Sequence, residues 1–600
     1  MLNGTYYMRQ VFYVVTPETG AFVENSNIQG NITFDGVGGY NFTGTVLNNT
    51  ATPAMTALTA SGNYAISGSG EGYIGAVNTS FPLDNIIGTV SHGVFIGSTT
   101  VTGSGYNDLF IATPLGSEAT NATLKGAYAV AYFDPTAPGD ALFTMTADGQ
   151  GNIGTVNVTS YLGASATAST QSLSGVTYAF INGAAQLKLG GARTSSTLVA
   201  GTELMYISPD GNFIFGGSAS GYDMFVGVRA ATSAPSNYDG LYYQAGLDLD
   251  ESAVGGGSSP LDSYYGSFQA LSGKIVGHQR FSTASLLHYR TLPSLLIFGG
   301  ASDFTYYDTY TLNSDGSSDD SAFAQHYLSS TDGTIRIGYG VGPYLSLNVA
   351  FQAPALNGSG VYLNPAGVVN AASSAPFTAQ ISPGEFLTLY GSGLAPTTAT
   401  ARLPFPTTFN QVQVLINQVA APIYYVSPTQ ISIVVPYVTP SDSVAQIYVV
   451  NNGTNSNLVS VFTGVTSTGV FTEPVGGIGN AAALHPDNST ITESSPAQIG
   501  ETVAVYLTGM GLVTPQVANG AAAPINQLTY TTATPLVYLL DAAGHYLQAP
   551  VTFSGLAPGF AGLYQINFTI PSGLVSGDAS LEIVGPDSDT FQASLPLTTN

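Results

Sequence analysis

A threefold internal repeat constrains the fold of this chain more than any other feature of its sequence. The repeat opens at Leu2–Tyr7, Leu124–Ala129 and Tyr238–Tyr243, and each opening places a Gly two residues before a Tyr. Each copy ends in two short apolar strands, such as Gly93–Ser98 followed by Gly105–Ile111. The period of about 115 to 120 residues is the size of a domain and too long for a solenoid repeat. We therefore expect three similar domains in tandem.

Each unit of this repeat has the pattern of strands joined by tight turns. Gly30–Gly44 alternates apolar and polar residues around the pair Asp35-Gly36, and Asp148-Gly149 repeats that turn in the second unit. Asp-Gly pairs tolerate the positive φ angles that tight hairpins need. The third unit departs most from the pattern, with a Gly- and Ser-rich insert at 255–260. We interpret the units as hairpin-rich antiparallel sandwiches or small barrels. Their expected bounds are 1–117, 118–234 and 235–354.

A second, different repeat occupies the C-terminal part of the chain, after a linker at 352–360. Pro383–Leu394 corresponds to Ile499–Leu512, and Tyr425–Pro436 corresponds to Ala557–Pro571. In each copy a Gln-Ile strand with period two ends at a proline, which cannot donate to a strand ladder. Two copies with several short strands predict immunoglobulin-like sandwiches. The predicted fold class is therefore all-β, with three sandwich or barrel repeats followed by two immunoglobulin-like sandwiches. The two sandwiches are expected at 355–465 and 466–600.

The C-terminal repeat also carries a family resemblance. The segments that carry it are Gly367–Ser373, Ile381–Glu385, Gly391–Pro396, Tyr425–Ile431 and Leu556–Asn567. In order and content they resemble the Solibacter-type uncharacterised C-terminal domain family of secreted acidobacterial surface proteins, over about 361–595. The N-terminal units resemble the Leu-x-Gly-x-Tyr and Asp-Gly-x-Gly β-repeats that often precede this domain. The resemblance implies export and a cell-surface setting, and it supplies no catalytic residues.

Charge is scarce in this chain and almost wholly acidic. Charged residues make up 8% of it, with 10 Lys and Arg against 35 Asp and Glu, for a net charge of −25. So few bases cannot neutralise a row of phosphates, which excludes nucleic acid as a partner. The sequence has no long apolar run of the kind that spans a bilayer, so we expect no insertion into a membrane. The scarcity of charge also disfavours long amphipathic helices.

Residue types also bear on the location of the protein. Cysteine is absent, which leaves neither disulfides nor thiolate metal sites. Met1–Gly4 lacks the basic and apolar regions of a signal peptide. Low charge with abundant Thr, Ser, Gly and Tyr is typical of exported proteins. We therefore expect an extracellular or cell-surface protein, exported through a signal peptide that is absent from this numbering.

Candidate catalytic residues form no motif that the sequence alone reveals. The six histidines show neither His-x-x-x-His nor His-Glu-x-x-His spacing, so we expect no zinc site. A Ser-His-Asp set stays open because its members can be far apart in sequence, although no strand–Gly-x-Ser-x-Gly–helix context supports one. The Gly-rich runs at 67–72 and 255–259 lack the Lys of a phosphate-binding loop. We expect no enzyme activity, no catalytic residue and no cofactor, and a secreted enzyme with accessory sandwiches remains an alternative.

An acidic turn in the third unit is the candidate metal site. Asn313–Asp320 gathers oxygen ligands of the kind that Ca²⁺ prefers, with Asp315, Asp319 and Asp320 as the candidate ligands. The segment lacks the distal Glu of an EF-hand loop, so an Asx-rich hairpin tip is the simpler interpretation. The default expectation is that this turn binds no metal.

Tyrosines and asparagines supply the remaining candidates. Tyr occurs 36 times, and adjacent pairs such as Tyr6-Tyr7 and Tyr242-Tyr243 put one ring on each face of a strand. The rings serve either core and cross-strand packing, or outward stacking on sugars or on a neighbouring subunit. Asn-x-Ser/Thr sequons are slightly more frequent than chance and are candidates for glycosylation. They begin at Asn3, Asn31, Asn41, Asn48, Asn78, Asn121, Asn157, Asn357, Asn452, Asn488 and Asn567.

The expected function is that of an extracellular structural surface protein, which associates with identical subunits into a filament or surface layer. Tandem β-units with little charge and no catalytic set motivate this expectation. Lysine, which usually guards sheet edges, is absent after Lys274. Strand addition or head-to-tail packing of five domains in a row would use such edges. The alternative is an adhesin or carbohydrate-binding surface protein that binds glycans through exposed Tyr.

Overall fold

The computed structural model shows an all-β protein. It describes residues 2–15, 22–49, 55–77, 85–99, 106–115, 119–136, 139–163, 165, 167–191, 199–230, 238–250, 261–283, 287–289, 296–298, 303–320, 325–342 and 344–599. The insert at 255–260 and the sequon at Asn78 lie outside these ranges. Within the ranges, no helix has the length and hydropathy that crossing a membrane requires.

The first repeat unit closes into an antiparallel barrel, in which each strand pairs with the next and the last pairs with the first. Ile32 and Phe34 point into this barrel, and Thr33 between them is exposed. At the predicted turn, the Asp35 carboxylate accepts hydrogen bonds from the N–H groups of Val37 and Gly39, both at 2.8 Å. The strands are β1 (Gly4–Val15), β2 (Phe22–Phe34), β3 (Gly39–Asn48), β4 (Met55–Ile66), β5 (Glu71–Ile74), β6 (Ile86–Ser91), β7 (Val94–Ser98) and β8 (Tyr106–Pro114).

The second unit forms a barrel of the same kind, closed by pairing of its last strand with its first. The Asp148 carboxylate accepts from the N–H groups of Gln150 and Asn152, at 2.6 and 3.0 Å, so the Asp-Gly turn recurs as predicted. The strands are β9 (Lys125–Asp134), β10 (Gly139–Asp148), β11 (Asn152–Leu162), β12 (Ser169–Ile181), β13 (Ala184–Gly190), β14 (Gly201–Ile207), β15 (Phe213–Ser218) and β16 (Met224–Arg229).

The third unit is also a closed barrel, although its sequence departs most from the repeat. Pairing of β19 with β22 and of β17 with β26 completes the ring, and β20 (Leu287–Tyr289) pairs with β21 (Leu296–Phe298) in the connection between β19 and β22. The barrel strands are β17 (Gly240–Asp250), β18 (Leu261–Leu271), β19 (Lys274–Thr283), β22 (Asp303–Leu312), β23 (Ser318–Asp320), β24 (Gln325–Ser329), β25 (Ile335–Gly340) and β26 (Tyr344–Gln352).

Barrel closure corrects one argument drawn from the sequence. The absence of lysine was expected to leave sheet edges open to strand addition. A closed barrel has no edge strand, since every strand is paired on both sides. In the three barrel rings the scarcity of lysine therefore has no bearing on edge-to-edge association, and in the third unit the separate β20–β21 hairpin keeps open edges.

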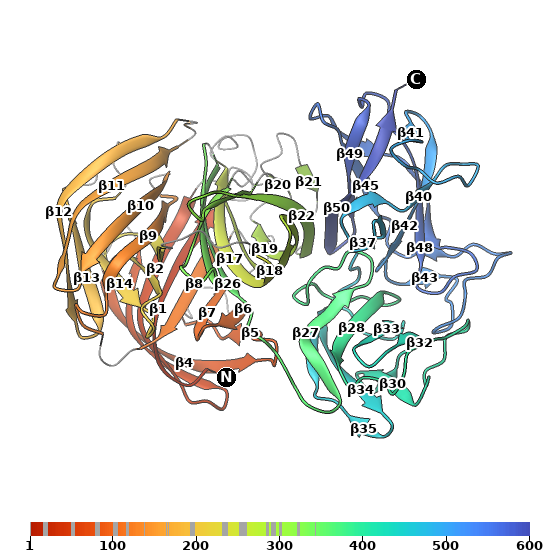
Figure 1. The fold of residues 1–600 in the computed structure, drawn as a ribbon, viewed down its shortest axis with the longest axis horizontal. Coiled ribbons are helices and arrows are strands. Elements are labelled where there is room, and N and C mark those ends of the chain that lie inside the picture. Colours follow the sequence, from red (N-terminus) through yellow and green to blue (C-terminus); the bar gives the residue numbers. More distant parts are fainter. Residues whose placement is uncertain are drawn as a thin grey trace.

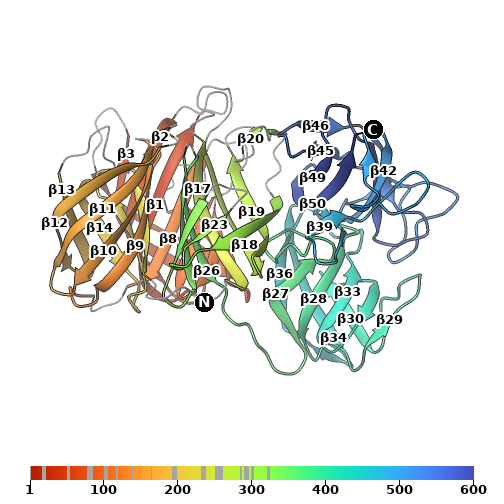
Figure 2. The same cartoon turned by 45° about the horizontal axis from the view of Figure 1, so that its top comes forward.

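The three barrels pack together around a shared apolar core instead of following one another in a row. This core unites outward-facing side chains of β1, β7 and β8 with those of β9 and β14–β16 and those of β17, β18, β25 and β26. A separate core fills the inside of each barrel. Each barrel thus contacts both of the others. Figures 1 and 2 show the barrels gathered at one end of the molecule and the sandwiches at the other.

The fourth unit is a sandwich of two sheets around an apolar core. One sheet has the order β27 (Tyr362–Asn370), β28 (Phe386–Ser392), β33 (Gln430–Val434), β32 (Ile423–Val426) and β29 (Ala399–Thr400). The other contains β31 (Val419–Ala420), β30 (Val412–Ile416), β34 (Ser443–Asn451), β35 (Thr454–Asn455) and β36 (Val459–Thr463).

The fifth unit is a second sandwich with its own core. One sheet contains β37 (Gly469–Val470), β40 (Ala483–Leu484), β42 (Thr502–Thr508), β48 (Tyr564–Thr569) and β47 (Val551–Leu556). The other contains β38 (Thr472–Glu473), β39 (Gly479–Ala481), β41 (Ala497–Gln498), β50 (Ser588–Thr598), β49 (Gly577–Val584), β45 (Leu536–Leu540) and β46 (Tyr546–Ala549). The short strands β43 (Val513–Thr514) and β44 (Tyr530–Thr531) pair separately.

The third barrel is joined to the last sandwich by a shared sheet. Asp303–Tyr306 of β22 pairs in parallel with Ser588–Phe591 of β50. Beside this pairing, Arg280 donates from Nε to Asp303 Oδ1 at 2.7 Å and from Nη2 to Gln380 Oε1 of the fourth unit at 3.2 Å. The joint fixes the barrels against the sandwiches and shapes the space between them.

Candidate functional site

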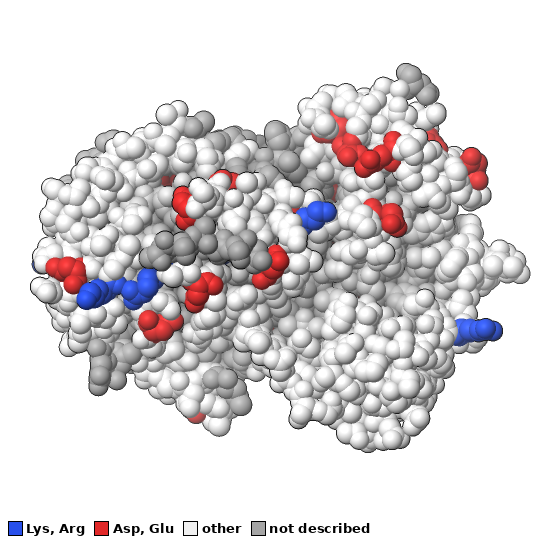
Figure 3. All heavy atoms as spheres, in the orientation of Figure 1, with Lys and Arg blue, Asp and Glu red and all other residues white. Residues whose placement is uncertain are grey.

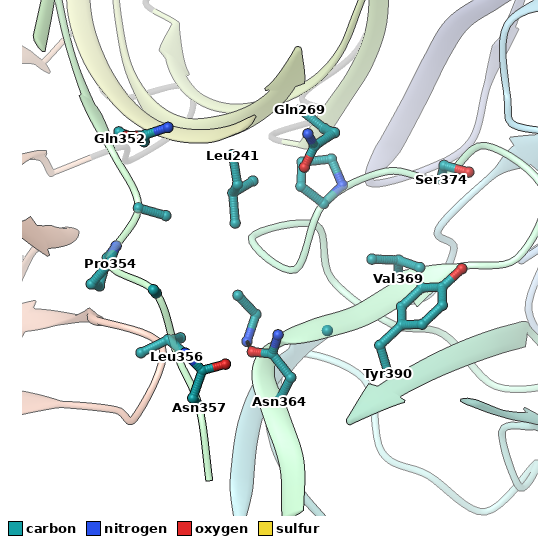
Figure 4. A pocket seen from close by; sticks show the side chains of 15 residues that line it. Leu241, Gln269, Gln352, Pro354, Leu356, Asn357, Asn364, Val369, Ser374 and Tyr390 are labelled. Carbon is teal, nitrogen blue, oxygen red and sulfur yellow. Dashed lines mark hydrogen bonds between the residues drawn. The ribbon is translucent and has the colours of Figure 1, made fainter. Parts of the chain in front are cut away.

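A cleft opens where the linker passes between the third barrel and the fourth unit. Leu241 of β17 and Gln269 of β18 line it from the barrel side, and Asn364 of β27 and Tyr390 of β28 line it from the sandwich side. The linker segment 353–357 forms one wall. The cleft has a volume of about 530 Å³, which lies within the usual range of small-molecule sites. Figure 4 shows side chains from these three segments turned toward a common space.

The polar lining of the cleft consists of uncharged groups. Carboxamides come from Gln269, Gln352, Asn357 and Asn364, and Tyr390 lines the other side of the cleft, near Val369. None of the described residues that line the cleft is an Asp, Glu, Lys or Arg. Figure 3 shows few basic and acidic side chains on this face, with most of the surface uncharged and the acidic side chains most concentrated on the last sandwich. The cleft therefore offers hydrogen-bond donors and acceptors with no net charge.

Local irregularities of the backbone position the cleft side chains. The pairing of β27 with β28 shifts register between Leu363 and Val368, and Asn364 lies in this bulge. Bulges re-aim side chains out of a regular ladder. The N–H of Ala366 donates to Asn364 Oδ1 at 3.0 Å, which fixes the orientation of that carboxamide. Ser374, which also lines the cleft, has a left-handed backbone with φ of 57°, a conformation that is often kept at functional sites.

Two glycines leave room for the side chains of the cleft. A Cβ at Gly367 would lie 3.0 Å from both the Cβ and the carbonyl oxygen of Tyr390. A Cβ at Gly240 would lie 2.9 Å from Gln352 Nε2. Tyr390 is 45% exposed to solvent. Gly367 begins one of the segments that carry the family resemblance, and its close approach to Tyr390 is a physical reason for glycine at that position.

The tyrosine pairs occupy two different cores. Tyr242 points into the third barrel and Tyr243 points out of it, as strand alternation predicts. The outward ring is also buried, because the Tyr243 hydroxyl donates to the Ser69 carbonyl of the first barrel. Tyr6 and Tyr7 divide in the same way between the inside of the first barrel and the shared core. These rings serve packing, and the exposed Tyr390 of the cleft was not singled out by the sequence.

The candidate calcium ligands do not converge. Asp315 Oδ1 accepts from the N–H and the hydroxyl of Ser317, at 3.0 and 2.6 Å, which is an Asx-type turn. Asp319 is exposed and contacts His326 Nδ1 at 2.6 Å, whereas Asp320 is buried and faces Arg336 at 3.5 Å. Neighbouring residues on a strand point to opposite faces. Nowhere among the described residues do three or more His, Cys, Asp or Glu side chains gather in a way that could hold a metal ion.

The sequons divide by exposure. Three of the described asparagines are half-buried and have carboxamide oxygens that accept hydrogen bonds from Ser26, Phe180 and Gln565; they are Asn48, Asn121 and Asn567. Asn357 is exposed on the wall of the cleft, so a glycan attached there would occupy the same space as a bound ligand. The exposed sequon asparagines are Asn3, Asn31, Asn41, Asn157, Asn357, Asn452 and Asn488.

Sequence reasoning missed the cleft for a topological reason. Its carboxamides come from the third barrel, the linker and the fourth unit, and no local spacing joins them. The linker itself was predicted at 352–360. The local features of the cleft are a bulge in one strand and an exposed Tyr on the next strand. Composition reveals neither of them.

Comparison with known proteins adds information for one part of the chain. The solved structures that resemble it include the gamma-CGTase of alkalophilic Bacillus clarkii (10% identity, 56% of this chain and 39% of that chain, TM-score 0.13). They also include a putative membrane anchored protein of Corynebacterium diphtheriae (8%, 79% and 96%, TM-score 0.11) and a putative DNA polymerase III beta subunit of Eubacterium rectale (8%, 58% and 91%, TM-score 0.09). These TM-scores are too low to support an argument about fold or function. The chain spans well under half the length of the gamma-CGTase.

No curated protein matches the chain. A family model does match the fourth unit, from Asn370 at the end of β27 to Phe462 in β36. The immunoglobulin-like sandwich that the repeat predicts for this unit agrees with the family that matches it. Residues 370–462 therefore form an IPT/TIG domain.

Proposed function

We propose that this chain is an extracellular surface protein that binds a neutral carbohydrate in the cleft between the third barrel and the IPT/TIG domain. The observation that carries this proposal is the composition of the lining, which combines carboxamides with an accessible aromatic ring and has no charged group among its described residues. Each carboxamide offers both donors and an acceptor. This pairing of groups matches sugar hydroxyls, which also donate and accept.

The ring of Tyr390 supplies the second element of the proposal. An aromatic face gives a flat apolar surface on which the C–H face of a pyranose ring can lie, while the phenol keeps a polar tip. Ligands that carry phosphate or carboxylate would need Arg or Lys partners, and the described lining has none. The cleft therefore favours uncharged polyhydroxylated ligands over anionic ones.

The cell-surface setting is the second part of the proposal. It is supported by the low charge of the chain and by the resemblance of 361–595 to the C-terminal domain of secreted acidobacterial surface proteins. The resembling segments hold the two sandwiches together. Glu385 accepts from Asn370 Nδ2 at 2.9 Å and from the Ser382 N–H at 2.7 Å, and Asn370 Nδ2 also donates to the Ser467 carbonyl at 3.0 Å. These residues form a scaffold that supports the cleft.

Self-association with identical subunits is a second candidate function, favoured by an uncharged apolar surface on the last sandwich. The chain has no Asp, Glu, Lys or Arg between Thr502 and Leu540. In this stretch Ile525 is 84% exposed, and its Cγ2 would lie 3.6 Å from a Cβ at Gly559, the residue that precedes the 53% exposed Phe560. Two chains of net charge −25 can approach most closely where no carboxylates oppose each other. Sedimentation of wild type and Ile525→Lys would test this: a concentration-dependent assembly lost in the variant supports it, and a monomer at every concentration contradicts it.

A glycan array followed by calorimetric titration tests the carbohydrate proposal. Binding to neutral glycans is expected, with little binding to sulfated or sialylated ones. Tyr390→Ala should weaken binding by about tenfold, since an aromatic contact contributes roughly 0.5–1.5 kcal/mol beyond its buried area. Tyr424→Ala is the matched control, because Tyr424 is similarly exposed on the same domain but does not line the cleft. Absence of neutral glycan binding, or equal loss in both variants, would contradict the proposal.

A further inference from the structure

A serine, a histidine and a glutamate converge on the surface of the last sandwich, far in the fold from the cleft. His485 follows β40, Ser495 precedes β41 and Glu501 precedes β42. His485 Nδ1 lies 2.7 Å from Glu501 Oε1, and His485 Nε2 lies 3.2 Å from Ser495 Oγ. This is the order of contacts in a nucleophile, a general base and an orienting carboxylate.

We propose that Ser495, His485 and Glu501 form a nucleophilic site that hydrolyses carboxylic esters of uncharged or cationic substrates. This activity goes beyond carbohydrate binding and does not depend on it. It also departs from the expectation, drawn from the sequence, that the chain is no enzyme. The three residues lie within one short segment but match no familiar motif, so their relation becomes visible only in the fold.

Main-chain hydrogen bonds hold the three side chains in place. The Gln498 N–H donates to Glu501 Oε2 at 2.7 Å, which leaves Oε1 directed at the imidazole. The Ser495 N–H donates to the Thr492 carbonyl at 3.0 Å and closes the turn that carries the serine. The His485 N–H donates to the Ser489 carbonyl at 2.9 Å. The geometry therefore belongs to ordered turns at the end of a sheet.

The tautomer of His485 follows from its two neighbours. The Glu501 carboxylate can only accept a hydrogen bond, so Nδ1 of His485 carries the hydrogen. Nε2 is left as the base toward Ser495 Oγ. The Ser495 carbonyl lies 3.1 Å from the same Nε2 and accepts from it when the imidazole is protonated. The neutral imidazole is thus the base beside the serine hydroxyl, and the protonated imidazole stays hydrogen-bonded to the serine main chain.

The site is open to substrates and carries negative charge. The three residues line a pocket of about 630 Å³, and Asp487 and Gln498 line it as well. Ser495 itself is exposed. The carboxylates of Asp487 and Glu501 repel an anionic substrate, which restricts the substrate class to neutral or cationic esters. Gln498 is also exposed in this pocket. Figure 3 shows acidic side chains gathered on this sandwich.

The proposed hydrolysis proceeds in two steps, acylation of the serine and hydrolysis of the acyl-serine. In the first, Ser495 Oγ attacks the ester carbonyl, its proton passes to His485 Nε2, and the alcohol leaves after taking that proton, so that an acyl-serine forms. In the second, water gives a proton to His485 Nε2 and attacks the acyl-serine, and the serine recovers its proton as the carboxylic acid leaves. Glu501 stabilises the imidazolium in both steps without changing its own protonation.

Another histidine of this sandwich provides a matched comparison. His545 Nδ1 contacts Asp541 Oδ2 at 2.9 Å, so it repeats the pair of base and carboxylate. Among the hydrogen bonds described for this part of the chain, the other ring nitrogen of His545 has no serine hydroxyl against it. A histidine paired with a carboxylate is thus common here, and the serine at the second nitrogen distinguishes His485.

Active-site labelling of the full chain tests the proposal. A fluorophosphonate probe, followed by peptide mass spectrometry, should modify Ser495 of the native protein, and p-nitrophenyl acetate should be hydrolysed. Ser495→Ala should abolish both, and His485→Gln should slow both by about 10²–10⁴-fold, the usual contribution of a general base. His545→Gln should leave both unchanged. Thermal unfolding of each variant verifies that the fold is kept.

The outcomes separate a catalytic site from an ordinary surface turn. Probe on Ser495 that disappears on heat denaturation and in His485→Gln supports the proposal. The proposal is overturned if the probe labels Ser495 no faster than it labels other serines. It is also overturned if the rates of labelling and hydrolysis are equal in wild type and in a folded His485→Gln variant. A negatively charged ester, such as the p-nitrophenyl monoester of succinate, should be hydrolysed more slowly than the acetate, and equal rates would overturn the assigned substrate class.

Discussion

Arg9 of the first barrel donates from Nη2 to the main-chain carbonyl of Asp223 in the second barrel at 2.7 Å, and neither side chain is exposed to solvent. The same guanidinium donates to Gln29 Oε1 at 2.7 Å within its own barrel and to the Ser218 carbonyl at 3.0 Å across the interface. The Asp223 carboxylate lies 3.9 Å from Nη2. One buried cation therefore fixes how two barrels face each other.

Removal of this cation is expected to destabilise the barrel assembly. Arg9→Ala should lower the free energy of unfolding by about 3–5 kcal/mol, because it leaves the Asp223 carboxylate buried without its partner. The measurement is denaturant unfolding followed by tyrosine fluorescence. Arg402→Ala, at an exposed arginine, should change the free energy by less than about 0.5 kcal/mol. Equal unfolding midpoints for the two variants would contradict the role given to Arg9.

Buried carboxyls whose pKa is raised, such as Glu71, contribute stability that is present in acid and is lost as the pH rises. Burial raises the pKa of Glu71 to about 8, although the nearby Arg280 and the Tyr265 hydroxyl, which donates to Glu71 Oε1 at 3.2 Å, act in the opposite direction. Burial also raises the pKa of Asp140 and of Glu385. Between the ordinary value of 4.5 and about 8, the folded chain holds a proton on Glu71 that the unfolded chain has released. The contribution of Glu71 to the free energy of unfolding therefore falls as pH rises through this window.

The variant Glu71→Gln isolates this effect. It should match wild type below about pH 4.5 and exceed wild type by several kcal/mol at pH 8, since one pKa unit corresponds to about 1.4 kcal/mol. Unfolding curves over this pH range provide the measurement. A constant difference between the two proteins at every pH would show that folding does not shift the pKa of Glu71.

The junction between β22 and β50 predicts that the two ends of the molecule stay together when the linker is cut. A protease site inserted between Ala355 and Leu356 should yield two fragments that co-elute in size-exclusion chromatography. The parallel pairing of Asp303–Tyr306 with Ser588–Phe591 joins one fragment to the other. The Gln380 N–H of the second fragment also donates to Asp303 Oδ2 of the first at 3.0 Å.

A substitution in that junction should release the fragments. Asp303→Asn removes the charge that pairs with Arg280 at 2.7 Å and should allow the cut chain to separate, whereas the exposed Asp442→Asn should not. Separation of the wild-type fragments would contradict a rigid junction.

Nucleophilic activity of Ser495 should rise with pH. Partial burial lowers the pKa of His485, but its hydrogen bonds to Glu501 and to the Ser495 carbonyl and the charge of Asp487 outweigh burial and raise the pKa above 6.5. The fraction of His485 in the base form therefore becomes dominant at a pH above 6.5. Labelling rates measured across a pH series should show an inflection above pH 6.5 in wild type and none in His485→Gln. A flat profile for wild type would mean that His485 is not the base.

Much of the fold could be predicted from residues that act locally. Asp35 and Asp148 form the turns that their Asp-Gly pairs predict. Strand alternation placed Tyr242 and Tyr243 on opposite faces. The repeat predicted three like domains, and their strands lie in 4–114, 125–229 and 240–352. These features depend on neighbours in sequence, which the sequence states directly.

The remaining features depend on contacts between distant segments. An outward Tyr such as Tyr243 cannot be assigned to solvent or to a core without knowing that another barrel covers it, so the sequence left both packing and exposure open for the paired Tyr. Packing holds for Tyr242 and Tyr243, whereas Tyr424 is 40% exposed. Barrel closure depends on β8 meeting β1, and no local pattern distinguishes that from an open sandwich. The cleft and the pair of His485 with Ser495 likewise arise from segments that the fold alone brings together.

The most direct test of the central claim is a crystal structure of the chain with the neutral glycan that binds best on the array. The account predicts a sugar ring against the exposed face of Tyr390, with hydroxyl groups within hydrogen-bonding distance of the carboxamides of Asn364 and Gln269. A glycan bound elsewhere on the molecule, with an empty cleft, would contradict it.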